Sequence, residues 1–227
     1  MFLAWLVACV GPVDDSDPGQ VAPIVFGFPL PEPDRFPALV GVDHDPVVQP
    51  DTAAGGFVCS DYLGRPWPHC YDEHDGSDYI LDGGFDAMDA GSSPIVAAAP
   101  GVVLETDDGH YDRCHVDPEA SDRISCDGYP QMANYVIVEH EGGYQTWYWH
   151  MKTDSVAVSP GDSVECGDLL GLVGSSGTSS GPHLHFEVET PDGVVIDPYA
   201  GPNSQPESYW EDQRETDVLP GAGCAGG

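Results

Sequence analysis

Two histidines stand two residues apart in the segment GTSSGPHLHFEV, residues 177–188. In a β-strand, side chains at positions i and i+2 point to the same face, so His183 and His185 would share one face of a sheet. Leu184 and Phe186 would then face the other side, which suits a core. Two neutral imidazoles directed at one point can form a metal site, or a metal ligand beside a base. The alternative is a pair of ordinary strand histidines.

A second segment, CYDEHDGSDYIL at residues 70–81, places His74 and Asp78 four residues apart with Gly76 between them. On a loop that enters a strand, the imidazole nitrogen and the carboxylate oxygen can converge on one ion. This spacing alone is weak, because it often arises by chance. With His185 it makes a set of two histidines and one carboxylate. Three protein ligands leave a fourth position for water, as in catalytic zinc sites.

The order of three motifs resembles the lysostaphin-type, or LytM-like, zinc endopeptidases. The motifs are H-x-G-x-D at 74–78, Y-x-H at 148–150 and G-x-x-x-G-P-H-L-H-F-E at 177–187. The connecting segments PIVAAAPGVV and SVAVSPGDSVECGDLLGLVG are also similar, so the resemblance covers roughly residues 70–199. It implies an antiparallel β-sheet core with a zinc-bearing groove. It also implies hydrolysis of peptide bonds in the stem peptides or cross-bridges of peptidoglycan.

Transferred residue by residue, the resemblance implies that His74, Asp78 and His185 are the Zn²⁺ ligands. It implies that His150 and His183 are catalytic histidines that do not bind the metal. Hydrolysis by a zinc-bound hydroxide needs a base for the water proton, a donor for the developing oxyanion and an acid for the leaving amine. Imidazole can take any of these roles, and the sequence does not assign them between His150 and His183.

The fold class follows from short β-type runs separated by Gly, Asp and Pro from residue 56 onward. No long helical periodicity is present, so we predict an all-β domain over residues 56–201, with an antiparallel sheet as its core. The segments expected to pair as hairpins are 134–140 with 144–150, and 183–189 with 193–197. Residues 93–106 predict two strands around Pro100-Gly101. Residues 107–133 predict a polar loop insertion pinned by a disulfide.

The cysteines predict disulfides in an oxidising compartment. The chain has seven cysteines, and Cys9 is set aside because it belongs to the N-terminal segment that resembles a lipobox. Pairing each of the other six with a cysteine near it in the sequence suggests Cys59–Cys70, Cys114–Cys126 and Cys166–Cys224. Zinc ligation by cysteine is disfavoured because no C-x-x-C pair exists.

His140 also follows a β-type run and is assigned a structural role.

The N-terminus predicts export from a bacterial cell. Residues 1–9 read as a signal peptide, and Leu6-Val7-Ala8-Cys9 resembles a lipobox, although no Lys or Arg precedes Cys9. Residues 10–55 are rich in Pro and Asp and predict a tether with an extended segment, and 202–227 predict a Gly/Pro/acidic tail. We therefore expect a membrane-anchored lipoprotein of the periplasm or cell envelope rather than a freely secreted protein.

Charge excludes some partners. The 39 acidic residues against 6 basic ones give a net charge of −33, which argues against binding to nucleic acid or electrostatic attachment to anionic lipid. Any membrane contact would be made through a lipid at Cys9, and the protein is expected to be monomeric.

The leading hypothesis is an exported zinc metalloendopeptidase that hydrolyses peptidoglycan. One alternative is a catalytically inactive LytM-like domain that binds the wall or activates a partner hydrolase. Another is a non-haem Fe(II) oxygenase, which also uses two histidines and one carboxylate. Export, disulfides and two additional histidines favour the hydrolase.

Overall fold

The computed structural model describes residues 24–47, 58–91, 93–120 and 123–224. The predicted signal peptide, the lipobox with Cys9 and much of the predicted tether lie outside these ranges. None of the described helices is long and apolar enough to cross a membrane.

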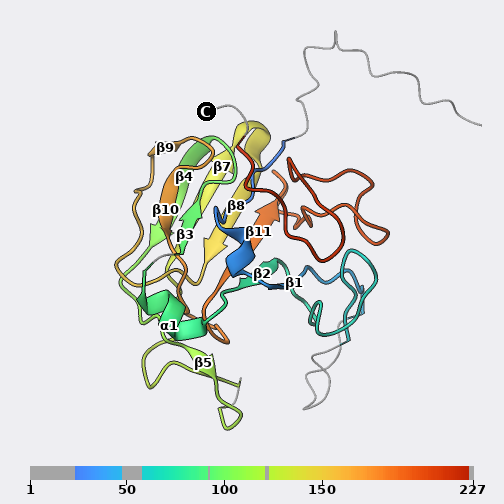
Figure 1. Ribbon diagram of the computed structural model, residues 1–227. Helices are drawn as coiled ribbons and strands as arrows, with labels where there is room; N and C mark the ends of the chain where they lie inside the picture. The colour runs from blue at the N-terminus through green and yellow to red at the C-terminus, as the bar shows by residue number, and fades with distance from the viewer. Residues whose placement is uncertain (1–23, 48–57, 92, 121–122, 225–227) are drawn as a thin grey trace, which may run out of the picture.

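The centre of the fold is a seven-stranded antiparallel sheet in the order β1-β2-β11-β8-β7-β4-β9 (Figure 1). Its strands are β1 (Ala38–Val40), β2 (Ser77–Ile80), β4 (Gly101–Asp107), β7 (Tyr135–His140), β8 (Gln145–Trp149), β9 (Ser163–Val164) and β11 (His183–Glu189). Two small sheets pair β3 (Pro94–Val96) with β10 (Leu169–Leu172), and β5 (His115–Val116) with β6 (Ile124–Ser125). The helical elements are short: α1 (Gly84–Asp89), η1 (Pro33–Arg35) and η2 (Glu141–Gly143). The predicted all-β class is confirmed.

The central sheet has one apolar face, because its side chains alternate with a period of two. Tyr148, Leu184 and Phe186 are fully buried on this face. Phe28 and Trp210, from segments at opposite ends of the chain, pack against each other and into the same core. The buried core therefore extends beyond the expected boundaries of 56–201 and includes parts of the predicted tether and tail.

Most of the predicted strands form, but not all of them pair as expected. The hairpin between β7 and β8 is confirmed, with η2 as its turn. Pro100 lies between two strands, β3 and β4, as predicted. β3 pairs with β10, and β4 pairs with β7 and β9. The predicted partner of β11 at 193–197 forms a single bridge, between Glu189 and Val195.

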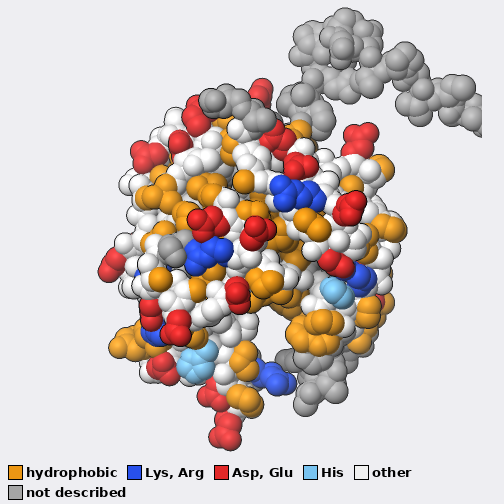
Figure 2. All heavy atoms as spheres, in the orientation of Figure 1, with side chains coloured by type: hydrophobic (Ala, Val, Ile, Leu, Met, Phe, Trp, Pro, Cys, Tyr) orange, Lys and Arg blue, Asp and Glu red, His pale blue; other side chains and the backbone are white. Residues whose placement is uncertain are grey.

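All three predicted disulfides are present: Cys59–Cys70, Cys114–Cys126 and Cys166–Cys224. Cys114–Cys126 pins the 107–133 insertion, which carries β5 and β6, and Cys166–Cys224 holds the C-terminal segment on the domain. On the face shown in Figure 2, Asp and Glu side chains are spread out rather than gathered in one patch. This distribution agrees with a solvated acidic surface.

Candidate metal centre

The pairing of β2 with β11 brings two distant segments to one point. His185 lies opposite Asp78 in this pairing, so their side chains share a face of the sheet. His185 Nδ1 lies 2.9 Å from Asp78 Oδ1, and His74 Nε2 lies 3.2 Å from the same oxygen. The two nitrogens are 3.3 Å apart. The structure thus brings together the three residues that the sequence predicted as metal ligands.

These distances fit a zinc ion. Zinc binds His nitrogen and carboxylate oxygen at about 2.0–2.2 Å in tetrahedral geometry, which sets neighbouring donor atoms about 3.3 Å apart. The three donors of His74, Asp78 and His185 form a triangle close to that size, and all three residues are buried. Two imidazoles and one carboxylate are also a ligand set that zinc accepts, with one position left for water.

His74 is held from behind by the backbone. It lies in the loop before β2, where its Nδ1 donates a hydrogen bond of 2.7 Å to the carbonyl oxygen of Gly41. Its ring stacks on Tyr71 at 4.1 Å between centroids. Because Nδ1 carries the proton, Nε2 keeps its lone pair and faces Asp78 and His185.

Gly76 makes room for the ligand on β11. A Cβ atom at this position would lie 2.5 Å from both Cε1 and Nε2 of His185 and 3.0 Å from the carbonyl oxygen of Phe186. Contacts under 3.0 Å require something to shift. The glycine between His74 and Asp78 is therefore needed for the close approach of the His185 ring.

The other two predicted site residues lie beside this triangle. The ring of His150 is 4.6 Å from that of His183 and 5.9 Å from that of His185. His150 follows β8 and has a φ of 64°, in the left-handed region that few residues other than glycine adopt. Such strain is often found at functional sites.

Each of these two histidines donates from Nδ1 to a backbone carbonyl. The acceptor for His150 is Ser176 O at 2.7 Å, and the acceptor for His183 is Gly181 O, also at 2.7 Å. Both rings are thereby fixed in the tautomer that leaves Nε2 free to take a proton. His183 Nε2 lies 3.5 Å from Asp78 Oδ1.

Burial and neighbouring charge shift the pKa values of the group. Burial opposes ionisation of Asp78, but the histidines around it, His74 and His183 foremost, hold its pKa well below the usual range. Burial also opposes protonation of His74 and His183, yet the Asp78 carboxylate raises the pKa of both. Burial and the adjacent histidines hold the pKa of His150 well below 6.5.

Two further carboxylates face the far side of the His185 ring. Asp75 Oδ1 lies 3.6 Å and Glu187 Oε2 lies 4.0 Å from His185 Nε2. Burial and the nearby Asp75 and Glu189 carboxylates raise the pKa of Glu187 to about 8. The His185 ring therefore has a carboxylate near each of its two nitrogens.

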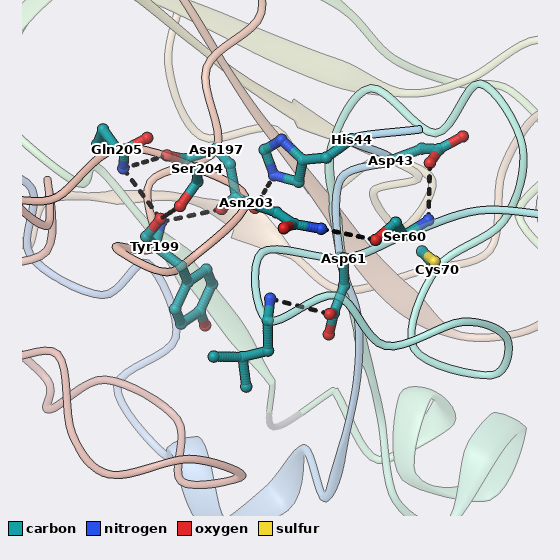
Figure 3. Close-up of polar contacts among 12 residues, drawn as sticks. Asp43, His44, Ser60, Asp61, Cys70, Asp197, Tyr199, Asn203, Ser204 and Gln205 are labelled. Carbon is teal, nitrogen blue, oxygen red and sulfur yellow. Dashed lines mark hydrogen bonds and ion pairs between the residues drawn. The ribbon is translucent and has the colours of Figure 1, made fainter. Parts of the chain in front are cut away.

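A polar network fixes the segment that presents the Gly41 carbonyl (Figure 3). His44 Nε2 lies 2.9 Å from Oδ2 of the buried Asp197. The Asp43 carboxylate accepts hydrogen bonds from the backbone of Ser60 and Glu73. Asp45 N donates to Asp43 Oδ1, which makes a turn. The contact between His44 and Asp197 joins residues 153 positions apart and could not be predicted from local sequence patterns.

The chain belongs to peptidase family M23, whose model matches residues 81–198, more than half of its length. The resemblance to lysostaphin-type peptidases is thereby confirmed. The family is zinc-dependent. The matched range includes His150, His183 and His185 and begins after His74 and Asp78.

Two curated relatives are named as endopeptidases, and the name of one of them specifies peptidoglycan. The chain is 30% identical over 115 residues to peptidoglycan DD-endopeptidase ShyA of Vibrio cholerae, a match that covers 51% of this chain and 20% of ShyA. It is 30% identical over 147 residues to DD-carboxypeptidase/endopeptidase Mpg of Neisseria meningitidis, a match that covers 64% of this chain and 26% of Mpg. The chain therefore spans about a quarter or less of these relatives. Among solved structures, the catalytic domain of lysostaphin from Staphylococcus simulans is 22% identical, with a TM-score of 0.37, and the match covers 63% of this chain and 85% of that one.

Proposed function

We propose that this protein is a zinc metalloendopeptidase that hydrolyses peptide bonds in peptidoglycan stem peptides or cross-bridges. His74, Asp78 and His185 would hold the zinc ion. A zinc ion bound there would acidify its water and polarise the scissile carbonyl. The observation that carries the proposal is the donor triangle of these three residues with two further histidines beside it.

The roles of His150 and His183 follow from their hydrogen bonds. Each Nδ1 donates to the backbone, so each Nε2 can accept a proton. One ring takes the proton of the attacking water, and the other, once protonated, donates to the developing oxyanion or the leaving amine. Because these hydrogen bonds already hold the rings of His150 and His183, the two side chains need not reorient during the reaction.

Peptidoglycan as the substrate and action outside the cytoplasm are inferred from the relative ShyA, which is named as a peptidoglycan DD-endopeptidase. The three disulfides support an oxidising compartment. We further propose that the protein is a monomer anchored through a lipid on Cys9. That residue lies outside the described part of the chain.

The second candidate function is an inactive domain that binds the wall or activates a partner hydrolase. An inactive domain would be expected to lose ligands or catalytic histidines, whereas all five are present here and converge. Metal analysis and digestion of purified peptidoglycan separate the candidates. Zinc near one ion per chain and release of peptide fragments support the peptidase. Bound zinc without hydrolysis would favour the inactive domain, and iron with O₂-dependent turnover would favour an oxygenase.

Digestion should use two kinds of wall, one with glycine cross-bridges and one with direct cross-links between stem peptides. Mass analysis of the released fragments then identifies the bond that is cut. His183→Ala protein, loaded with zinc, is the matched control, because it keeps the three metal ligands and lacks one proton carrier.

A further inference from the structure

Asp78 and His185 are directly paired across β2 and β11, and this row of paired residues continues across the neighbouring strands. Strand register places Asp78 opposite His185, His185 opposite Trp149, and the β8 residues opposite those of β7. Directly paired residues share a face, so Trp149 lies on the metal face, next to a ligand. Trp147 lies on the same face one row away, opposite Glu187 and Ile137.

Three aromatic rings on this face form a continuous shelf. The rings of Trp147 and Trp149 are stacked, with 5.6 Å between centroids and an angle of 14°. The ring of Tyr135, on β7, lies 4.5 Å from that of Trp149. All three residues are partly exposed. We call Tyr135, Trp147 and Trp149 the aromatic shelf.

Carboxylates surround the shelf. In the row beyond Trp147, Gln145 stands between Glu139 on β7 and Glu189 on β11. These two glutamates are therefore diagonal neighbours of Trp147 on its two flanking strands, within reach of an aromatic side chain. Glu105 of β4 accepts a hydrogen bond from the Tyr135 hydroxyl at the other end. The five strands β2, β4, β7, β8 and β11 carry no Lys or Arg.

We propose that the aromatic shelf, with Glu139 and Glu189, is a substrate subsite that binds the ammonium group of a diamino acid in the peptide. This proposal rests on the peptidase function proposed above and specifies its substrate. An aromatic face attracts a cation through its ring quadrupole, and Trp does so most strongly. Carboxylates at the edge of the shelf add charge complementarity and disfavour a substrate that presents an anion there. The shelf and the metal row are contiguous, so one peptide can occupy both.

The test compares two forms of the same purified cross-linked muropeptides, one with free amino groups and one with these amino groups N-acetylated. Acetylation removes the positive charge and keeps the peptide. For the zinc-loaded protein, we expect acetylation to raise KM about tenfold, with little change in kcat. Equal KM values for the two forms would overturn the proposal.

Two variants locate the effect. Glu139→Gln removes the charge of an exposed side chain, and Trp147→Leu removes one ring of the aromatic shelf. Each variant should raise KM for the free-amine form and leave KM for the acetylated form unchanged. Trp67→Leu is the control, because Trp67 is an exposed tryptophan outside the sheet. An equal rise in KM for both forms in Trp147→Leu would mean that the shelf contacts a sugar ring or an apolar group, which would refute the proposal.

Failure of the proposed peptidase function gives a different result, since neither form would then be hydrolysed. In that case, calorimetric Kd values for the two forms test the subsite directly. Tighter binding of the free-amine form, lost in Glu139→Gln, supports it, and equal Kd values refute it.

Discussion

Nδ1 of His74 donates a hydrogen bond of 2.7 Å to the carbonyl oxygen of Gly41, 33 positions earlier in the chain. A carbonyl oxygen can only accept, so this contact fixes the protonated nitrogen of the imidazole and directs the other one to the metal position. Gly41 lies just after β1 and before the range that matches the family model. A segment outside the matched range thus orients a proposed zinc ligand.

Gly76→Ala should weaken zinc binding. Its new Cβ would lie 2.5 Å from the His185 ring, so the ring must move from the donor triangle. We expect a loss of zinc affinity of about 10–100-fold, the range seen when the surroundings of a metal ligand are disturbed. The measurement is competition for zinc with a chelator of known affinity.

Gly41→Ala is the matched control for this substitution. A Cβ there would lie 3.6 Å from the nearest atom, an ordinary contact, and the carbonyl that accepts from His74 is retained. Zinc affinity should stay near that of the wild type. Equal losses in the two variants would show that the position of the His185 ring is not what limits binding.

His185→Ala and His183→Ala should have different effects, although the two residues are neighbours on one face of β11. His185→Ala removes a donor of the triangle, so purified protein should contain little zinc by elemental analysis. His183→Ala leaves the triangle intact and should retain zinc, while hydrolysis of peptidoglycan falls about 10²–10⁴-fold through loss of acid–base catalysis. Near-normal hydrolysis by zinc-loaded His183→Ala protein would contradict its catalytic role.

The sequence predicted the face shared by His183 and His185, because a period of two is a local property of a strand. Their approach to His74 and Asp78 depends on the pairing of β2 with β11 across more than 100 residues, which local patterns do not specify; only the resemblance to a family indicated it. The Gly41 carbonyl could not be predicted, since every residue carries one. The partners of β3 and β4 could not be predicted for a similar reason: Pro100-Gly101 indicates a turn between two strands, but it does not specify which other strands they pair with.

His44→Ala should destabilise the fold. The substitution leaves the buried Asp197 carboxylate without its imidazole partner, although the backbone N–H of Tyr199 still donates to it. An unpaired buried polar group costs about 1–3 kcal/mol, and we expect a loss of this size in the free energy of unfolding from denaturant titration. His69→Ala, at a partly exposed histidine, should have a smaller effect. Equal losses would mean that the pair with Asp197 adds nothing.

His140 should make stability depend on pH. It lies on the apolar face of the sheet, where its Nδ1 donates to Pro100 O and its Nε2 accepts from the Thr146 hydroxyl. Burial lowers its pKa below the ordinary value of 6.5. Between the lower pKa of His140 in the folded state and its ordinary pKa in the unfolded state, the unfolded chain binds more protons than the folded one. The contribution of His140 to stability is therefore fully present above about pH 6.5 and is lost as the pH falls below that value.

The His140→Gln variant should lose less stability than the wild type between pH 7.5 and about 5.5. A glutamine amide can donate to Pro100 O and accept from Thr146, but it does not titrate. The measurement is the thermal midpoint across this pH range, with His115→Gln, at a partly exposed histidine of the 107–133 insertion, as the control. The control should follow the wild type. If His140→Gln falls as steeply as the wild type, the acid sensitivity belongs to other groups.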